Sequence, residues 1–540
     1  MAAQIAQPVR TAEWPPWLRR LVLLGAMVVA SLATLSLSNA SLSTYYKHVA
    51  PHHGLLASLP FLATAAGALA FMKERYGQFV PLLRVSIRSS AVGLLVYLVI
   101  EPPQFTVAAA ELAGQATYVH LAYYAALALG VASVLVPSLI IPVVVYVIST
   151  RQLIDDISGI PSSTLDIRYM LDMALYLSVA GLVTSRIRFD APKWASYRAQ
   201  KEITFIAFGL HLSNYFWSGI AKLALGPYLW TWPLENRTYS IIPYAIEKGA
   251  SPFGHSPLVA QWSYEVMQLV AVPANSAIVL FQVFAIVCVL RLAWLKLATL
   301  FYDVLHISIY VFSGILFWPW IWNNFTILMA AQSMRGRIPK TCQVVCILTI
   351  ALSYPSLGLY KAAWLGWFDV TDARQMHIEA VTENGRSRVP PSFFLSHSFG
   401  VSLGYMDTAA HEGHYEHTNW NSSRDHSRHA SSGTCPTPPA KPPRAESAHQ
   451  REARLARLSR FIRAHHAKMV ERQAALGKYS YYLRMHHHPS NPFLFWQFAQ
   501  TDLRQVRGYD LVLESVCHDI HNGQVSKRVV GRTVEHFSVR

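Results

Sequence analysis

The sequence predicts an all-α, polytopic membrane protein of about 8–10 transmembrane helices with a smaller C-terminal extramembrane region, either helical or α+β. Three observations support this. Of the 540 residues, 52% are hydrophobic and only 14% are charged, which is too apolar for an ordinary soluble enzyme. Apolar stretches long enough to cross a hydrocarbon core of about 30 Å recur before residue 360. After Trp367 these stretches end, and histidine, arginine, serine and proline become frequent.

The positions of the apolar stretches give the expected spans. In the first half they begin at Leu21, Gly54 and Met170, end at Ile100, and fill 118–148; in the second half they end at Leu225, begin at Ser276, lie between Leu297 and Met329, and surround Cys342. The 118–148 run is too long for one upright helix, so Pro137 and Pro142 either split it into two spans or kink one tilted span. The split is favoured because it leaves the main lysine and arginine clusters on one side.

This topology predicts a cytoplasmic N-terminus, with a retained first helix after Arg19 and Arg20, and a non-cytoplasmic chain after residue 360. Lysine and arginine outnumber aspartate and glutamate by 46 to 30, but the excess is spread over loops and tail. Positive-inside bias and anionic lipid account for this excess, so membrane lipids are expected partners and nucleic acid is not.

Four segments follow along the chain: a transmembrane helical domain at 1–360, a His-rich extramembrane segment at 361–433, a Pro-rich linker at 434–447, and a C-terminal region at 448–540. The last contains an amphipathic helix whose apolar stripe is Leu455, Leu458, Ile462 and Met469. It lies either on an anionic lipid surface or, as favoured, on the tail's own core. Short strands with a turn at Asn522 and Gly523 are expected to follow.

The five cysteines imply no disulfide framework. Cys342 and Cys346 lie one helical turn apart, which is typical of small apolar residues in a helix.

A polar face marks the helix that ends near Leu225. His211, Asn214, Tyr215, Ser218 and Lys222 share that face at about 100° per residue. Charged Lys222 at membrane depth costs roughly 3 kcal/mol, so it either snorkels to the interface or points into the bundle as a competent general base. Asp172 and Glu265, isolated acids in apolar surroundings, are candidate partners of this lysine.

A second polar face comprises Asp303, His306 and Tyr310, spaced i, i+3 and i+7. An aspartate and a histidine so placed can hydrogen-bond and fix the imidazole tautomer. A structural polar contact with another helix is an equal alternative. Asn323 and Asn324, among three tryptophans, are interpreted as the end of this span at the interfacial aromatic belt.

The tail motif HEGHYEH places His411, His414 and His417 at three-residue intervals. On an irregular loop they could converge on zinc or copper, although a solvated loop is favoured.

Two of these stretches resemble a known family. NYFWSGIAKL, at 214–223, resembles the YFxAGxxKL helix of the vitamin K-dependent gamma-carboxylases and their relatives with the horizontally transferred transmembrane (HTTM) domain. LFYDVLHISIYVFSGILFWPWIWNNFTIL resembles a later span of that family. Together the matches cover roughly residues 200 to 335 and appear in the family's order.

The resemblance implies a carboxylase-like membrane scaffold and a quinone-like or lipid-like ligand. In the family the motif lysine deprotonates a reduced quinone, and Lys222 is the matching position. The doubled lysine of the family is Ala221-Lys222 here, and a second catalytic histidine has no counterpart. The resemblance therefore implies the scaffold and the ligand rather than glutamate carboxylation.

The leading hypothesis is a membrane enzyme in which Lys222 takes a proton from a lipid-soluble substrate. The proposed catalytic residues are Lys222, His211, Tyr215, Asp303 and His306, and the proposed ligand-binding residues are Ser218 and Tyr310. The alternatives are a proton-coupled transporter, a haem or copper oxidoreductase, and a non-catalytic scaffold that holds a protein partner through its C-terminal region.

Overall fold

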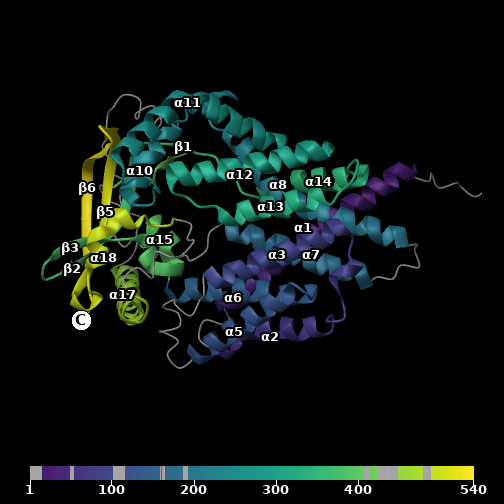
Figure 1. Cartoon of the computed structure of the whole chain (residues 1–540), viewed down its shortest axis with the longest axis horizontal. Coiled ribbons are helices and arrows are strands. Elements are labelled where there is room, and N and C mark those ends of the chain that lie inside the picture. The colour runs from purple at the N-terminus through teal and green to yellow at the C-terminus, as the bar shows by residue number, and fades with distance from the viewer. Residues whose placement is uncertain are drawn as a thin grey trace, which may run out of the picture.

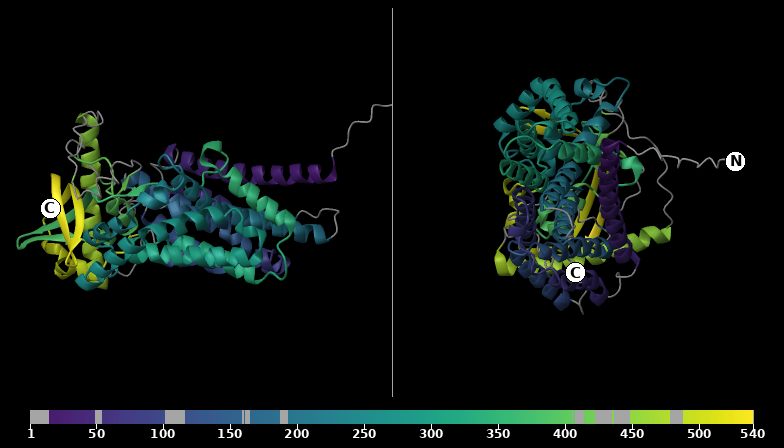
Figure 2. Two further views of the ribbon diagram at one scale, coloured as in Figure 1. Left: turned by 90° about the horizontal axis from the view of Figure 1, so that it is seen from above. Right: turned by 90° about the vertical axis from the view of Figure 1, so that its right-hand side faces the viewer.

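The computed structural model shows a helical bundle with an antiparallel sheet at one end (Figure 1). It describes residues 15–48, 54–100, 116–158, 160, 165–186, 193–404, 406, 414–421, 435, 448–477 and 488–539. His411 and the Pro-rich linker, except Cys435, lie outside these residues. Most bundle helices run along the long axis, and α17 crosses it beside the sheet (Figure 2).

The long helices of the bundle are α1 (Pro16–His48), α2 (Gly54–Leu69), α3 (Pro81–Ile100), α5 (Ala116–Ser133), α6 (Ile140–Ser158), α7 (Leu165–Arg186), α8 (Lys193–Leu223), α11 (Pro257–Phe284), α12 (Leu292–Ser313), α13 (Trp318–Gln332) and α14 (Lys340–Leu352). Helix α8 packs against α7, α11 and α14 in the bundle. Two short helices, α9 (Thr231–Glu235) and α10 (Ile241–Lys248), join α8 to α11.

Five of the described helices, α1, α3, α7, α11 and α12, are long and apolar enough to cross a membrane, and four shorter helices are also apolar. The chain is therefore a multi-pass helical membrane protein with a C-terminal sheet. The 118–148 run is divided into α5 and α6 with a break at Pro137, as the split predicts. The prediction of a helix start at Ser276 is wrong, because α11 begins at Pro257, where proline fits the first helical turn.

The C-terminal sheet has the strand order β3-β2-β5-β6, all antiparallel: β2 (Asp372–Thr382), β3 (Gly385–Val389), β5 (Gly508–His521) and β6 (Gln524–Ser538). The predicted turn is confirmed, since Asn522 and Gly523 both have positive φ. The hairpin strands are longer than expected. The β2–β5 pairing joins the His-rich segment and the C-terminal region in one sheet. A two-stranded sheet pairs β1 (Phe368–Asp369) with β4 (Trp420–Asn421).

One face of the large sheet packs on α17 (Ala448–Leu476), which confirms the favoured interpretation of the amphipathic helix. Leu458, Ile462 and Met469 are at most 5% exposed and share a core with residues of β2 and β5. The lipid-surface alternative for this stripe is therefore wrong. Burying three large apolar side chains contributes roughly 1.5–3 kcal/mol each to the stability of this region.

A disulfide joins Cys435 to Cys517, which are 82 positions apart in the sequence. The cysteine spacing implied no disulfide framework, and this single bond was not predicted because one distant pair leaves no spacing pattern. Cys342 and Cys346 are free and buried in α14, as predicted.

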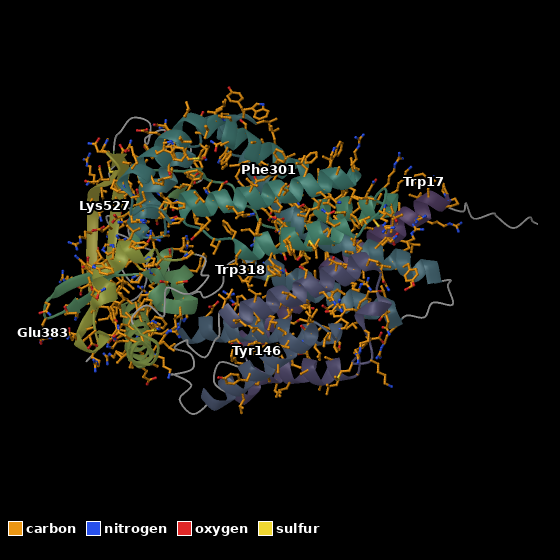
Figure 3. The ribbon with its side chains drawn as sticks, viewed as in Figure 1. Trp17, Tyr146, Phe301, Trp318, Glu383 and Lys527 are labelled. Atoms are coloured by element: carbon orange, nitrogen blue, oxygen red, sulfur yellow. A yellow bond between two sulfur atoms is a disulfide. The ribbon has the colours of Figure 1, made fainter. Side chains whose placement is uncertain are left out.

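The second face of the sheet meets α10 through charged side chains. Glu247 of α10 accepts hydrogen bonds from Lys527 at 3.0 Å and from Arg388 at 3.3 Å. Lys527 also donates to Glu514 of β5 at 2.9 Å. Lys527 lies on the yellow hairpin at the sheet end of the molecule (Figure 3). This cluster connects the sheet to the helical part of the chain.

Glu247→Gln should reduce stability at neutral pH and remove part of its acid dependence. Burial raises the pKa of Glu247, but Arg388 and Lys527 outweigh burial and lower it from 4.5 to about 2. A lowered folded-state pKa gives stability that is complete above pH 4.5 and is lost as pH falls towards 2. The full effect is about 3 kcal/mol. Thermal unfolding of both proteins between pH 7 and pH 3 measures this effect.

The control variant is Glu383→Gln, which removes an exposed acid paired with Arg507. This surface pair should contribute at most about 1 kcal/mol. Equal effects of the two substitutions would contradict the prediction.

Candidate functional site

Helix α8 is the central element of the site. It packs against α7, α11 and α14, and two glycines permit the close contacts. A Cβ at Gly209 would lie 2.7 Å from Thr349 of α14, and one at Gly219 would lie 2.9 Å from Gln282 of α11. The predicted polar face is accordingly enclosed by protein. His211, Tyr215 and Ser218 are each 1% exposed, and Lys222 is 8% exposed.

Asn324 of α13 is the hub of a buried hydrogen-bond network. Its Oδ1 accepts from His211 Nε2 at 2.9 Å and from the Tyr215 hydroxyl at 3.2 Å. Its Nδ2 donates to Asp303 Oδ1 of α12 at 3.0 Å. One amide therefore links α8, α12 and α13. We call Asn324, His211, Tyr215, Asp303 and His306 the Asn324 network.

The tautomers of both histidines follow from their hydrogen bonds. His211 Nε2 donates to Asn324, and its Nδ1 lies 3.4 Å from the donor amide of Asn323. Both ring nitrogens of His211 are engaged by amides, which disfavours this residue as a haem or copper ligand. His306 Nδ1 donates to the carbonyl of Tyr302 at 2.8 Å, so the main chain fixes its tautomer.

Aromatic rings enclose the network. The Tyr215 ring stacks on Tyr302 with centroids 3.8 Å apart, and Trp320 makes edge contacts with His211, Tyr215 and His306. This packing holds the polar atoms in an apolar surrounding, where hydrogen bonds are stronger than in water.

Lys222 lies apart from this network, at the end of α8. Its Nζ donates to the Leu365 carbonyl at 2.6 Å and lies 5.4 Å from the centroid of a Trp232 ring and 6.0 Å from that of Trp367. The 362–369 segment crosses the last turn of α8 so closely that a Cβ at Gly366 would lie 2.8 Å from Ala221. The Lys222 side chain is 8% exposed, so protein surrounds its amine at this end of α8.

The acid near Lys222 is Asp369, which is 7% exposed. The Asn236 side chain binds both the side chain and the main chain of Asp369. It donates to Oδ2 at 2.9 Å and accepts from the Asp369 main-chain amide at 2.7 Å. Burial raises the pKa of Asp369 to about 6, while Asn236 and Lys222 act in the opposite direction. The carboxyl is therefore mostly ionised at neutral pH and can balance a charged amine.

The two predicted partners of Lys222 lie elsewhere. Asp172 accepts from Asn39 at 2.8 Å and from Tyr360 at 3.1 Å, and it pairs with Arg168. Glu265 is exposed on α11 and accepts from Gln261. Both assignments to Lys222 are wrong. The position of an isolated acidic residue in a sequence does not show which helix its side chain will contact.

Of the two predicted ligand-binding residues, Ser218 adjoins Lys222. Its hydroxyl donates to the Ala363 carbonyl and accepts from the Leu365 amide, both at 3.3 Å, so it holds the crossing segment. Tyr310 lies on α12, half-buried, and the hydrogen bonds of the Asn324 network do not include it. The predicted set therefore separates into the Asn324 network and a Lys222 site, between which the described residues show no hydrogen bond.

Sequence reasoning missed three contributors: Asn324, Asp369 and Trp232. The interpretation of Asn323 and Asn324 as a span end is wrong, because they are at most 1% exposed and lie in the bundle. Gly314, in the left-handed region, ends α12 and lets α13 return beside it. The sequence signal that could have indicated the buried position of Asn324 is the pair of adjacent amide side chains, Asn323 and Asn324, inside an apolar span.

The tail histidines do not gather around one point. His414 binds Ser515 at 3.1 Å and Thr533 at 2.9 Å, whereas His417 binds Asp372 at 3.1 Å. The described residues contain no group of three histidine, cysteine or acidic side chains placed to hold a metal ion. His411 lies outside the described residues.

Comparisons with protein-family models, curated proteins and solved structures give no match for this chain.

Proposed function

We propose that the protein is an integral membrane enzyme in which Lys222 takes a proton from a lipid-soluble weak acid of the quinol class. The observation that carries this proposal is the set of groups around the Lys222 amine. They are the carbonyls of Leu365 at 2.6 Å and Ser218 at 3.4 Å, two indole rings, and buried Asp369 in its electrostatic field. Carboxylase-like HTTM proteins, which the 200–335 region resembles, supply the substrate class. The Trp232 and Trp367 rings beside the amine suit contact with a quinol ring.

The proposed step moves one proton. The substrate O–H bond breaks, an N–H bond forms on the neutral Lys222 amine, and the products are a quinolate anion and an ammonium group. The two new charges lie next to each other, which offsets the cost of creating them in an apolar site. Ionised Asp369 stabilises the ammonium form. The main-chain carbonyl of Leu365 orients the amine.

Ser218 has a positioning role in this proposal. Its two hydrogen bonds to the crossing segment place the Leu365 carbonyl above Lys222. Asn214 assists, because its Oδ1 accepts from the Ala363 amide at 2.9 Å. The polar face of α8 thus fixes the main chain that binds the amine.

The proposal includes the orientation of the chain, with the C-terminal region on the non-cytoplasmic side. The Cys435–Cys517 disulfide supports this side, because disulfides persist in oxidising compartments and are rare in the cytosol.

A proton-coupled transporter is the second candidate. The observation that favours it is the Asn324 network, in which His211, Tyr215 and Asp303 hydrogen-bond one amide. His306, a fourth titratable side chain, lies 3.5 Å from the Tyr215 hydroxyl. Buried titratable groups in a membrane bundle are typical of proton pathways. Proton flux into proteoliposomes would distinguish this function from quinol chemistry.

The test is formation of the quinolate anion without oxygen. Reduced 2-methyl-1,4-naphthoquinone is added anaerobically to the full chain in phosphatidylcholine nanodiscs near neutral pH, where the free quinol is protonated. We expect the red-shifted absorption of the bound anion with the natural protein and its loss, by at least about tenfold, with Lys222→Met. Arginine at this position cannot act as a base, so Lys222→Arg should also lose the band.

The matched control is Lys296→Met, which removes a lysine of α12 that hydrogen-bonds Gln332 at the bundle surface. It should keep the band. Size-exclusion profiles and the melting temperature establish that each variant is folded. An undiminished band in folded Lys222→Met or Lys222→Arg protein would overturn the proposal.

A further inference from the structure

The residues from the end of α8 to the end of α9 form a compact unit, here called the 224–235 segment. Gly226 has φ +93°, and a Cβ there would lie 2.5 Å from Thr231. Thr231 closes the turn, accepting from the Tyr228 amide at 3.1 Å and donating its own amide to the Tyr228 carbonyl at 3.0 Å. The turn therefore presents its side chains in fixed directions.

The 224–235 segment has two different faces. Thr231 and Trp232 of its inner face are 3% and 4% exposed. The outer face consists of large apolar side chains with high exposure: Tyr228 75%, Leu229 65%, Trp230 50% and Leu234 63%. So many exposed large apolar groups within seven positions are uncommon on a surface that meets only water.

The segment is attached to a membrane span. Trp232 shares a buried cluster with Val279 of α11, one of the five candidate spans. Asn275 of α11 donates to the Asn236 carbonyl at 2.8 Å, directly after the segment. Helix α11 itself exposes Leu269 and Leu280, at 83% and 56%. The segment is thus attached to a candidate span that itself exposes large apolar side chains.

The inner face of the segment forms one wall of the Lys222 site. The Trp232 ring lies 5.4 Å from Lys222 Nζ, and its Nε1 donates to the Trp367 carbonyl at 2.6 Å. Tryptophan and tyrosine are the residues enriched where a bilayer meets water. The outer face of this short segment therefore carries the side chains that are typical of a bilayer interface. Its inner face forms a wall of the Lys222 site.

We propose that the 224–235 segment lies in the bilayer interface, with its outer face among the lipids, and forms a lateral entrance to Lys222. A quinol with a long apolar tail resides in the bilayer, and this route brings it to the amine without crossing water. The lipid contact stands independently, whereas the role as an entrance rests on the proposed function.

Lipid contact is tested with a nitroxide at Leu229→Cys, in the full chain in phosphatidylcholine nanodiscs. The three free cysteines are buried. The reference site is Val529→Cys, at a 42% exposed apolar position of β6 in the sheet. Collision rates with oxygen, which concentrates in lipid, and with a water-soluble nickel chelate are compared by electron paramagnetic resonance. We expect oxygen to dominate at position 229 and the chelate at 529. The same ratio at both positions would overturn the lipid contact.

The entrance is tested with Trp230→Asp and its conservative counterpart Trp230→Phe. A charge at the interface should slow capture of a long-tailed naphthoquinol from the bilayer by about tenfold. Capture of the short, water-soluble quinol should be unchanged, and Trp230→Phe should retain both rates. Equal slowing of both quinols, or of neither, would overturn the entrance. If neither quinol forms an anion with the natural protein, the proposed function fails, whereas the nitroxide result still decides the lipid contact.

Discussion

Replacing Asn324 by leucine should destabilise the bundle by about 2–4 kcal/mol. Leucine has a similar volume but no polar atoms, so His211, Tyr215 and Asp303 would each lose a partner while remaining in the bundle. Unpaired buried polar groups keep their desolvation cost. Thermal unfolding in detergent micelles should show a clearly lower melting temperature.

Asn323→Leu is the matched control for this prediction. Asn323 is also buried on α13, but in the Asn324 network it makes only one long contact, with His211 at 3.4 Å. Its substitution should cost less than that of Asn324. If both variants melt at the same temperature, Asn324 is not the hub that the geometry indicates.

Removal of the disulfide should lower the stability of the C-terminal region by about as much as Asn324→Leu lowers that of the bundle. Cys517→Ser opens the link to Cys435 across 82 residues, and long links of this kind contribute about 2–4 kcal/mol. Limited proteolysis should cut the C-terminal region of the variant much faster than that of the natural protein. The five candidate spans should stay protected in the membrane.

The reciprocal variant gives the control. Cys435→Ser removes the same bond, so it should match Cys517→Ser, and the double variant should show no further loss. Reduction of the natural protein should bring it to the same stability. Additive losses would contradict the assignment of both effects to one disulfide.

Sequence periodicity predicted the features of the fold that depend on local backbone geometry. The polar face of α8 follows from a repeat of 3.6 residues, and the apolar stripe of α17 follows from the same rule. The turn at Asn522 and Gly523 follows from the need for positive φ. Each of these features is encoded within a few neighbouring positions.

Contacts between distant residues were not predictable in this way. Asp369 lies in the electrostatic field of Lys222 because the 362–369 segment crosses α8. Strand β2 pairs with β5 across more than a hundred residues. Asn324 joins two helices that have no shared sequence pattern. Periodicity assigns a side chain to a face, but the opposite partner depends on the packing of whole helices.

The most direct test of the central claim follows the charge on Lys222 itself. In protein labelled with ¹³C at the lysine ε position, the signal that is absent from Lys222→Arg is assigned to Lys222. On anaerobic addition of reduced 2-methyl-1,4-naphthoquinone, that signal should move to the position of an ammonium group in step with the quinolate absorption. A Lys222 signal that stays unchanged while quinol binds would contradict the claim that this amine is the base.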